Sequence, residues 1–161
     1  MLDAAFRLGY RCAYCCARAW WFVRRPRTNG AAVALWHDGR LLLIRTSYRD
    51  RYTLPGGFVG RKEEARAAAA RELREEIGVN VFPVDLVAAY EATIFLEHHY
   101  DHLAIFEAEV ASQPGITANG RELLWAGWMT TEEAEALPQL ARHTRAYLAA
   151  RASRTAGEET T

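Results

Sequence analysis

Three glutamates near the middle of the chain, Glu72, Glu75 and Glu76, are spaced in a way that suits the binding of a metal ion. In a helix, positions i, i+3 and i+4 bring the three carboxylates to one side within a single turn. Like charges so close repel one another, which disfavours the arrangement in a helix built for stability alone. A divalent cation would remove the repulsion. Clustered carboxylate oxygens suit Mg²⁺ or Mn²⁺, which would then bind the phosphate oxygens of a substrate.

These glutamates belong to a longer pattern of glycine, glutamate, Arg-Glu, Glu-Glu and glycine at fixed intervals. The pattern is met by Gly57, Glu63, Arg71, Glu72, Leu73, Glu75, Glu76, Gly78 and Val79. The segment resembles the Nudix box, and the chain is therefore similar to the Nudix hydrolase family. The resemblance implies an α/β fold, a Nudix-type α/β/α sandwich with a mixed β-sheet, and hydrolysis of a diphosphate bond that depends on Mg²⁺ or Mn²⁺.

The resemblance also implies roles for the residues of the box. Glu72, Glu75 and Glu76 would be metal ligands, and the backbone carbonyl of Gly57 would complete the site, since glycine lets the backbone come close to a ligand.

Arg71 and Glu63 would support these ligands, because an arginine can orient a carboxylate through two parallel hydrogen bonds. Glu63 lies eight residues before Arg71. A direct pair between them requires the helix to begin after Glu63.

The general base that activates water is less clearly marked, because similar proteins use either a box glutamate or a loop glutamate. The candidates are Glu72, Glu76, Glu91, Glu97 and Glu122. A metal lowers the proton affinity of a carboxylate that it binds, which weakens a box glutamate as a base. We nevertheless predict Glu72, with Glu97 as the next choice.

Substrate contacts are predicted from the polar segment before the glycine turn. Arg49 and Arg51 could bind phosphate, and Tyr48 and Tyr52 could stack on a base. The alternative is an ordinary exposed loop. Three further predicted substrate contacts are Arg45, Glu97 and Asp101.

The composition is that of one globular domain. The chain has 161 residues and a formal net charge of zero, so stable nucleic-acid binding is not expected. Its three cysteines, Cys12, Cys15 and Cys16, are too few and too crowded for a disulfide framework. Arginines interrupt any apolar stretch near the N-terminus, so neither a signal peptide nor a spanning helix is predicted. We expect a cytoplasmic protein, or one that associates with the membrane surface.

Residues 1–28 are predicted to form a basic, aromatic helical extension, with the helix itself over residues 3–23 and Pro26 closing it. Trp20 and Trp21 beside arginines suit three roles: packing on the domain or on a second copy, contact with a membrane surface, or contact with substrate. We therefore expect either a peripheral membrane contact or a homodimer through residues 3–25 as further partners.

Residues 29–150 are predicted to form the catalytic domain, and residues 151–161 a disordered tail. Strands are predicted at 31–37, 41–45, 84–95, 100–110 and 123–129. One helix is predicted to open at Glu63 and Glu64, where carboxylates favour the positive end of the helix dipole, and further helices are predicted at 131–138 and 139–150.

The favoured function is Mg²⁺-dependent hydrolysis of a nucleoside diphosphate linked to another moiety. Two alternatives remain. One is a Nudix domain that senses nucleotide without cleaving it, and the other is a membrane-surface or interaction protein that works through its N-terminal helix. The sequence does not identify the particular substrate.

Overall fold

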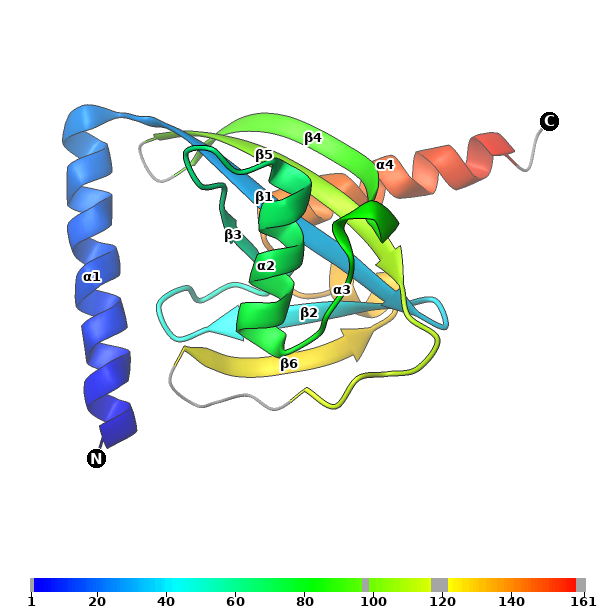
Figure 1. The fold of residues 1–161 in the computed structure, drawn as a ribbon, viewed down its shortest axis with the longest axis horizontal. Helices are drawn as coiled ribbons and strands as arrows, with labels where there is room; N and C mark the ends of the chain where they lie inside the picture. Colours follow the sequence, from blue (N-terminus) through cyan, green and yellow to red (C-terminus); the bar gives the residue numbers. More distant parts are fainter. Residues whose placement is uncertain (1, 97–98, 117–121, 159–161) are drawn as a thin grey trace.

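A computed structural model describes residues 2–96, 99–116 and 122–158. Figure 1 shows the arrangement of its helices and strands. In chain order they are α1 (Leu2–Arg24), β1 (Arg27–His37), β2 (Arg40–Thr46), β3 (Gly56–Phe58), α2 (Ala65–Ile77), a 3₁₀ turn η1 (Pro83–Asp85), β4 (Val87–Leu96), β5 (His99–Glu109), β6 (Leu123–Met129), α3 (Thr131–Glu135) and α4 (Arg142–Glu158).

The strands form a mixed sheet in the order β4-β5-β1-β2-β6, with β3 paired to β1. β1 runs parallel to β5 and antiparallel to β2 and β3. The central strand β1 therefore pairs with β2, β3 and β5, and it lies directly beside the glycine-rich strand β3. This pairing places the start of the box against the middle of the sheet.

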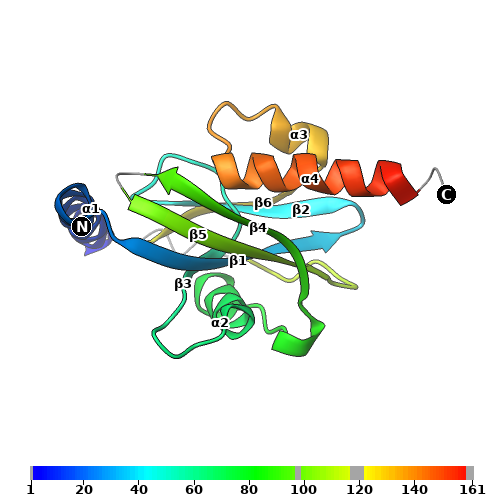
Figure 2. The same ribbon diagram turned by 90° about the horizontal axis from the view of Figure 1, so that it is seen from above.

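Both faces of the sheet are covered, which explains why β1 is apolar at every position over most of its length. Ala31, Val33 and Leu35 face the core beneath α2, and the alternate residues Ala32 and Ala34 face the core beneath α3 and α4. Figure 2 shows α2 on one side of the sheet and α3 and α4 on the other. The predicted α/β/α sandwich with a mixed sheet is confirmed.

Helix α2 carries the box glutamates and begins at Ala65, after Glu63. Consecutive alanines favour the helix, and Ala68, Ala69, Leu73 and Ile77 bury one face of it in the core. Gly78 ends it in the left-handed conformation, with φ of 74°, and its N–H donates to the carbonyl oxygen of Arg74. The buried stripe leaves the glutamates on the side of the helix that borders β3.

The C-terminal segment differs from its prediction. A disordered tail from residue 151 is wrong as far as residue 158, because α4 continues to Glu158. Tyr147 and Leu148 are buried in the core, and the next turns are held by Glu107, which accepts a 2.8 Å hydrogen bond from Arg154 and lies 3.5 Å from Arg151. Contacts distant in sequence therefore extend the helix.

Helix α1 extends over the segment predicted to be helical and ends before Pro26. It stands beside the domain and leads into the start of β1 (Figure 1). Its three cysteines are exposed and unpaired by disulfides. In the described part of the chain, no helix is both long and apolar enough to cross a membrane.

Candidate active site

Arg71 on α2 and Glu63 just before the helix form the predicted pair. The carboxylate of Glu63 accepts hydrogen bonds from Nε and Nη2 of Arg71, of 2.9 Å and 3.0 Å. It also accepts a 2.9 Å bond from the backbone N–H of Gly60. These bonds lower the pKa of Glu63 to about 2, with the bond from Arg71 as the largest cause. The turn before α2 brings Glu63 back to Arg71, as the pair requires.

The same guanidinium also reaches the other residues of the box. Its Nη1 donates to Glu72 at 2.8 Å and to Glu75 at 3.2 Å, and its Nη2 donates to the carbonyl oxygen of Phe58 at 3.1 Å. The charge-assisted bond to Glu63, and after it the bond to Glu72, raise the pKa of Arg71 above its usual value. Arg71 therefore ties β3, the turn and two box glutamates into one network.

Glu76 lies deeper than the other box glutamates. Its carboxylate accepts a 2.8 Å hydrogen bond from the backbone N–H of Gly56. Burial raises the pKa of Glu76 to about 8, and the nearby charges of Glu72 and Glu122 add to this rise. A carboxylate this poorly solvated and close to other carboxylates is one whose charged form a cation would stabilise.

Gly57 packs directly against Glu72. A Cβ atom added at Gly57 would lie 2.5 Å from the carboxyl carbon of Glu72. The sequence therefore needs glycine here because the carboxylate occupies the space that a side chain would take. This contact places the backbone of Gly57 beside one of its expected co-ligands.

The box glutamates open into a cavity of about 300 Å³ between α2 and the segment that follows β2. Its polar lining includes Glu72, Glu75, Glu76, Glu122 and Arg49. A smaller cavity of about 70 Å³ continues beside it toward α4.

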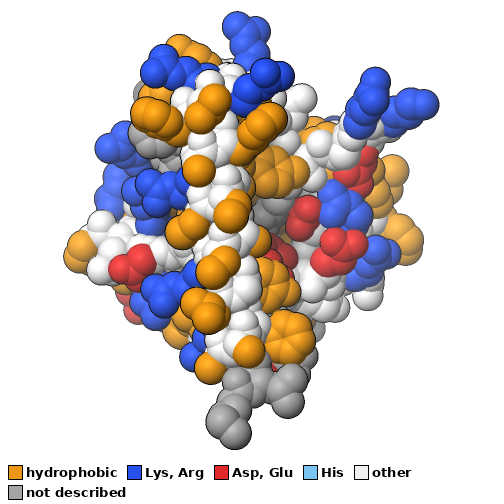
Figure 3. All heavy atoms as spheres, turned by 90° about the vertical axis from the view of Figure 1, so that its left-hand side faces the viewer, with side chains coloured by type: hydrophobic (Ala, Val, Ile, Leu, Met, Phe, Trp, Pro, Cys, Tyr) orange, Lys and Arg blue, Asp and Glu red, His pale blue; other side chains and the backbone are white. Residues whose placement is uncertain are grey.

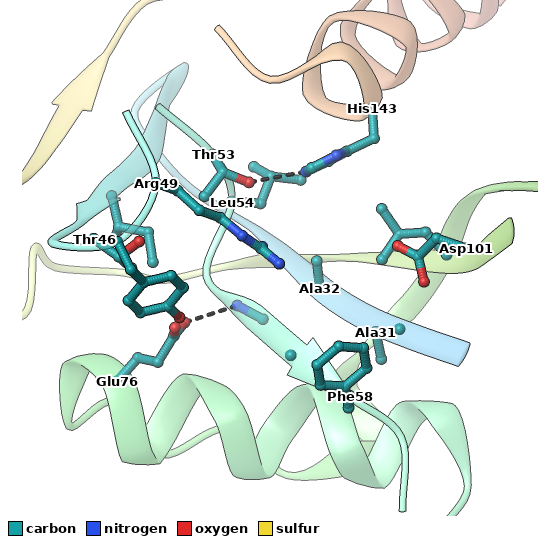
Figure 4. A pocket seen from close by; sticks show the side chains of 16 residues that line it. Ala31, Ala32, Thr46, Arg49, Thr53, Leu54, Phe58, Glu76, Asp101 and His143 are labelled. Atoms are coloured by element: carbon teal, nitrogen blue, oxygen red, sulfur yellow. Dashed lines mark hydrogen bonds between the residues drawn. The ribbon is translucent and has the colours of Figure 1, made fainter. Parts of the chain in front are cut away.

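Seven residues line both cavities: Thr46, Tyr48, Arg49, Gly56, Gly57, Phe58 and Glu76. Figure 4 shows Arg49 reaching across the smaller cavity, with Glu76 below it and Asp101 and His143 on the far walls.

The residues of the larger cavity fit a divalent cation by their chemistry. Several carboxylates line one cavity, and Gly57 lies among them. Within residues 2–96, 99–116 and 122–158, however, no three His, Cys, Asp or Glu side chains converge closely enough to hold an ion as they stand. The reason is visible in the contacts, since Arg71 holds Glu72 and Glu75 while Gly56 holds Glu76.

The predicted substrate contacts separate into two groups. Arg49 lines both cavities and Asp101 lines the smaller one, where it accepts a 2.7 Å hydrogen bond from Thr28. Arg45 and Tyr52 line neither cavity.

Arg45 and Tyr52 instead face each other, with the guanidinium 5.7 Å from the ring centroid, and Arg45 also lies 3.6 Å from Asp50. Arg51 is exposed and lines neither cavity. Contact of these three residues with substrate stays a prediction. Glu97 lies outside the described residues.

His143 is a cavity residue that the sequence analysis did not single out. Its Nε2 lies 2.8 Å from the hydroxyl of Thr53, and both residues line the smaller cavity (Figure 4). Burial lowers its pKa to about 4, and the positive charges of Arg49 and Arg51 contribute. Thr53 and His143 are 90 residues apart, so no local pattern could have paired them.

Helix α1 packs against the cavity mouth through aromatic rings. Tyr14 lies 5.3 Å from the ring of Tyr48, and Trp21 lies 6.2 Å from the ring of Phe58. On its outward side, hydrophobic side chains run along the helix with Lys and Arg side chains beside them (Figure 3). The contacts support packing on the domain, one of the three roles expected for this helix.

Comparison with known proteins identifies the family. A model of the NUDIX domain family matches residues 26–151, and the chain belongs to that family. The resemblance to Nudix hydrolases is thus confirmed.

Curated relatives agree with this assignment. The chain is similar to a MutT-like protein of Streptomyces ambofaciens, with 38% identity over 63 residues that make up 39% of this chain and 41% of that protein. It is also similar to the NAD-capped RNA hydrolase NudC of Stutzerimonas stutzeri, with 29% identity over 159 residues, 92% of this chain and 54% of that protein. The chain spans about half the length of these relatives, or less.

Solved structures share the fold. The MutT NUDIX hydrolase of Burkholderia pseudomallei superposes with a TM-score of 0.65 and 24% identity, covering 76% of this chain and 96% of the other. An Ap4A hydrolase of C. elegans gives a TM-score of 0.67 at 17% identity, covering 81% and 98%. At these identities the likeness concerns the fold alone.

Proposed function

We propose that the chain hydrolyses the pyrophosphate bond of a nucleoside diphosphate linked to another moiety, with Mg²⁺ or Mn²⁺ as cofactor. The observation that supports this most is the larger cavity, in which Glu72, Glu75 and Glu76 lie on one wall and Arg49 also lines the space. Carboxylates suit the cation and an arginine suits the phosphates of one substrate. In this proposal residues 29–150 are the catalytic domain and residues 1–28 an extension of it.

The names of relatives agree with a substrate of this class. One curated relative is named for NAD-capped RNA and one solved neighbour for Ap4A. Both names point to nucleotides joined through phosphates to a second group. For this chain we propose a small molecule rather than a nucleic acid, because its formal net charge is zero.

Each residue of the network has a distinct part in the proposed reaction. Glu72, Glu75, Glu76 and the carbonyl of Gly57 would hold the cation, which supplies charge neutralisation and acidifies a bound water. Glu72 would accept the proton of the attacking water. Arg71, fixed by Glu63, would keep the carboxylates oriented, and Arg49 would bind the phosphates.

The proposal is tested by incubating the protein with Mg²⁺ and a panel of ADP-ribose, NAD and diadenosine tetraphosphate. We expect at least one member of the panel to release a nucleoside phosphate, which chromatography detects. Binding without any product would favour the nucleotide-sensing alternative, and no binding to any member would refute the proposal.

A second role for the extension also remains a proposal. The side chains of Trp20 and Phe22 are both 59% exposed, which suits either peripheral membrane contact or a homodimer through residues 3–25. The double variant Trp20→Ala/Phe22→Ala, which removes exposed side chains and leaves Tyr14 and β1 in place, tests this role. Loss of vesicle binding or of the dimer mass, with hydrolysis retained, would support this role. A variant that still binds vesicles and forms dimers as the unchanged protein does would count against it.

A further inference from the structure

One stripe of α1 faces the domain while the rest of the helix is exposed. The stripe consists of Tyr10, Tyr14, Ala17 and Trp21, at helical positions i, i+4, i+7 and i+11. Trp21 is only 8% exposed, whereas its neighbour Trp20 is 59% exposed. The helix is thus fixed to the domain along a single face.

This stripe contacts two aromatic residues that line both cavities. The rings of Tyr10 and Tyr14 lie 6.2 Å and 5.3 Å from the ring of Tyr48. The ring of Trp21 meets Phe58 edge-on at 6.2 Å. Tyr48 follows β2 and Phe58 ends β3, so the helix braces both segments at the mouth of the site.

Arg49 is held within the same cluster. Its Nε donates a 3.3 Å hydrogen bond to the hydroxyl of Tyr14, and its guanidinium lies 5.4 Å from the Tyr14 ring and 5.8 Å from the Tyr48 ring. Arg49 lines both cavities, and Figure 4 shows its side chain pointing into the smaller one.

We infer that Tyr14 is a positioning residue that holds the Arg49 guanidinium toward the phosphates of the substrate, so that the N-terminal helix forms part of the substrate site. This inference rests on the proposed function. An arginine on an irregular segment has many rotamers, and selecting one costs conformational entropy on binding. Tyr14 restricts Arg49 before the substrate arrives, through one hydrogen bond and one cation–π contact. Binding is therefore tighter, although Tyr14 does not itself touch the reacting atoms.

The test measures the affinity for α,β-methylene-ADP, a diphosphate that resists cleavage, by calorimetry with Mg²⁺. We expect Tyr14→Ala to weaken binding by about 10-fold and Tyr14→Phe, which keeps the ring, by about 3-fold, as the loss of a cation–π contact and a hydrogen bond predicts. Leu8→Ala, on an exposed part of the same helix, is the matched control and should leave the affinity unchanged.

A double-mutant cycle separates positioning from a general structural effect. In the presence of Arg49→Gln, Tyr14→Ala should change the affinity by less than about 2-fold, because the group that it positions is gone. An undiminished effect of Tyr14→Ala in that background would overturn the inference, as would unchanged affinity in Tyr14→Ala alone or no binding by the wild type. If the Tyr14→Ala protein does not fold, the same cycle with Tyr14→Phe decides. Intact binding without turnover of the panel would refute the proposed hydrolysis alone.

Discussion

The carboxylate of Glu63 accepts two nearly equal hydrogen bonds from the guanidinium of Arg71, of 2.9 Å and 3.0 Å. The remaining nitrogen of Arg71 is thereby directed at Glu72 and Glu75. One arginine thus connects the turn before α2 with the carboxylates on it. The arrangement makes Arg71 an organiser of the site, which leads to a direct test.

Arg71→Lys should lower kcat/KM by about 10- to 100-fold, as expected when the residues that orient metal ligands are changed. Lysine keeps the positive charge but cannot make two parallel hydrogen bonds to one carboxylate. Steady-state kinetics measures the loss, with thermal melting as a check on folding. Arg74→Lys, an exposed change on the same helix, should behave as the wild type, and equal activity of the two variants would contradict the role of Arg71.

Gly57→Ala should reduce activity while the fold is retained. The added methyl group would displace the carboxylate of Glu72, a flexible side chain that can turn away, whereas the surrounding backbone need not move. We expect a fall of about 10-fold or more in kcat, as for other changes that misplace a ligand. Gly115→Ala, where an added Cβ meets nothing within 4 Å, is the control. Full activity of Gly57→Ala would show that the position of the Glu72 carboxylate is unimportant.

The choice of general base can be tested with two glutamates. Glu72→Gln should lower kcat by about 100-fold or more, the usual contribution of a positioned base. Glu91→Gln should leave kcat within about 2-fold, since Glu91 lies 2.8 Å from His102 on β5 and lines neither cavity. The reverse order of effects in the same assay would exclude Glu72 as the base.

The neutral state of His143 should make the folded protein sensitive to acid. Its pKa is about 4 in the folded protein, below the ordinary value of 6.5, so the unfolded chain binds the proton more readily between these values. Stability from this group is therefore fully present above about pH 6.5 and is lost as the pH falls toward 4, by about 3 kcal/mol.

Urea denaturation of the wild type and of His143→Gln over this pH range measures the contribution of His143. The variant should lose less stability on acidification than the wild type. Parallel curves for the two proteins would mean that His143 is not the group responsible.

The sequence was sufficient where the determining interactions are local. The alanines and Gly78 predicted the body and the end of α2, because they act within one helix and its C-terminus. Its start was predicted slightly early, at Glu63 and Glu64, whereas α2 begins at Ala65. β6 was predicted with its observed bounds, Leu123–Met129. The Glu63–Arg71 pair was foreseen as a condition on where the helix begins, and α2 satisfies that condition.

Contacts between segments that are distant in the chain could not be predicted from the sequence. The extension of α4 depends on Glu107 of β5, and the pairing of Thr53 with His143 joins two segments 90 residues apart. Of the three arginines before the glycine turn, only Arg49 lines the two cavities. Arg49 donates to Tyr14 of α1, whereas Arg45 lies against Tyr52 and Asp50. The contact of Tyr14 with Arg49 likewise has no local pattern in the sequence.

The most direct test of the central claim is the hydrolysis rate of the best panel substrate as a function of Mg²⁺ concentration, in the wild type and in Glu76→Gln. Glu64→Gln, an exposed glutamate just before the same helix, is the control. The account predicts saturable Mg²⁺ dependence in the wild type and in Glu64→Gln, and a loss of about 100-fold or more in Glu76→Gln, since a cation ligand is removed. A rate that is independent of Mg²⁺, or one that Glu76→Gln leaves unchanged, would contradict it.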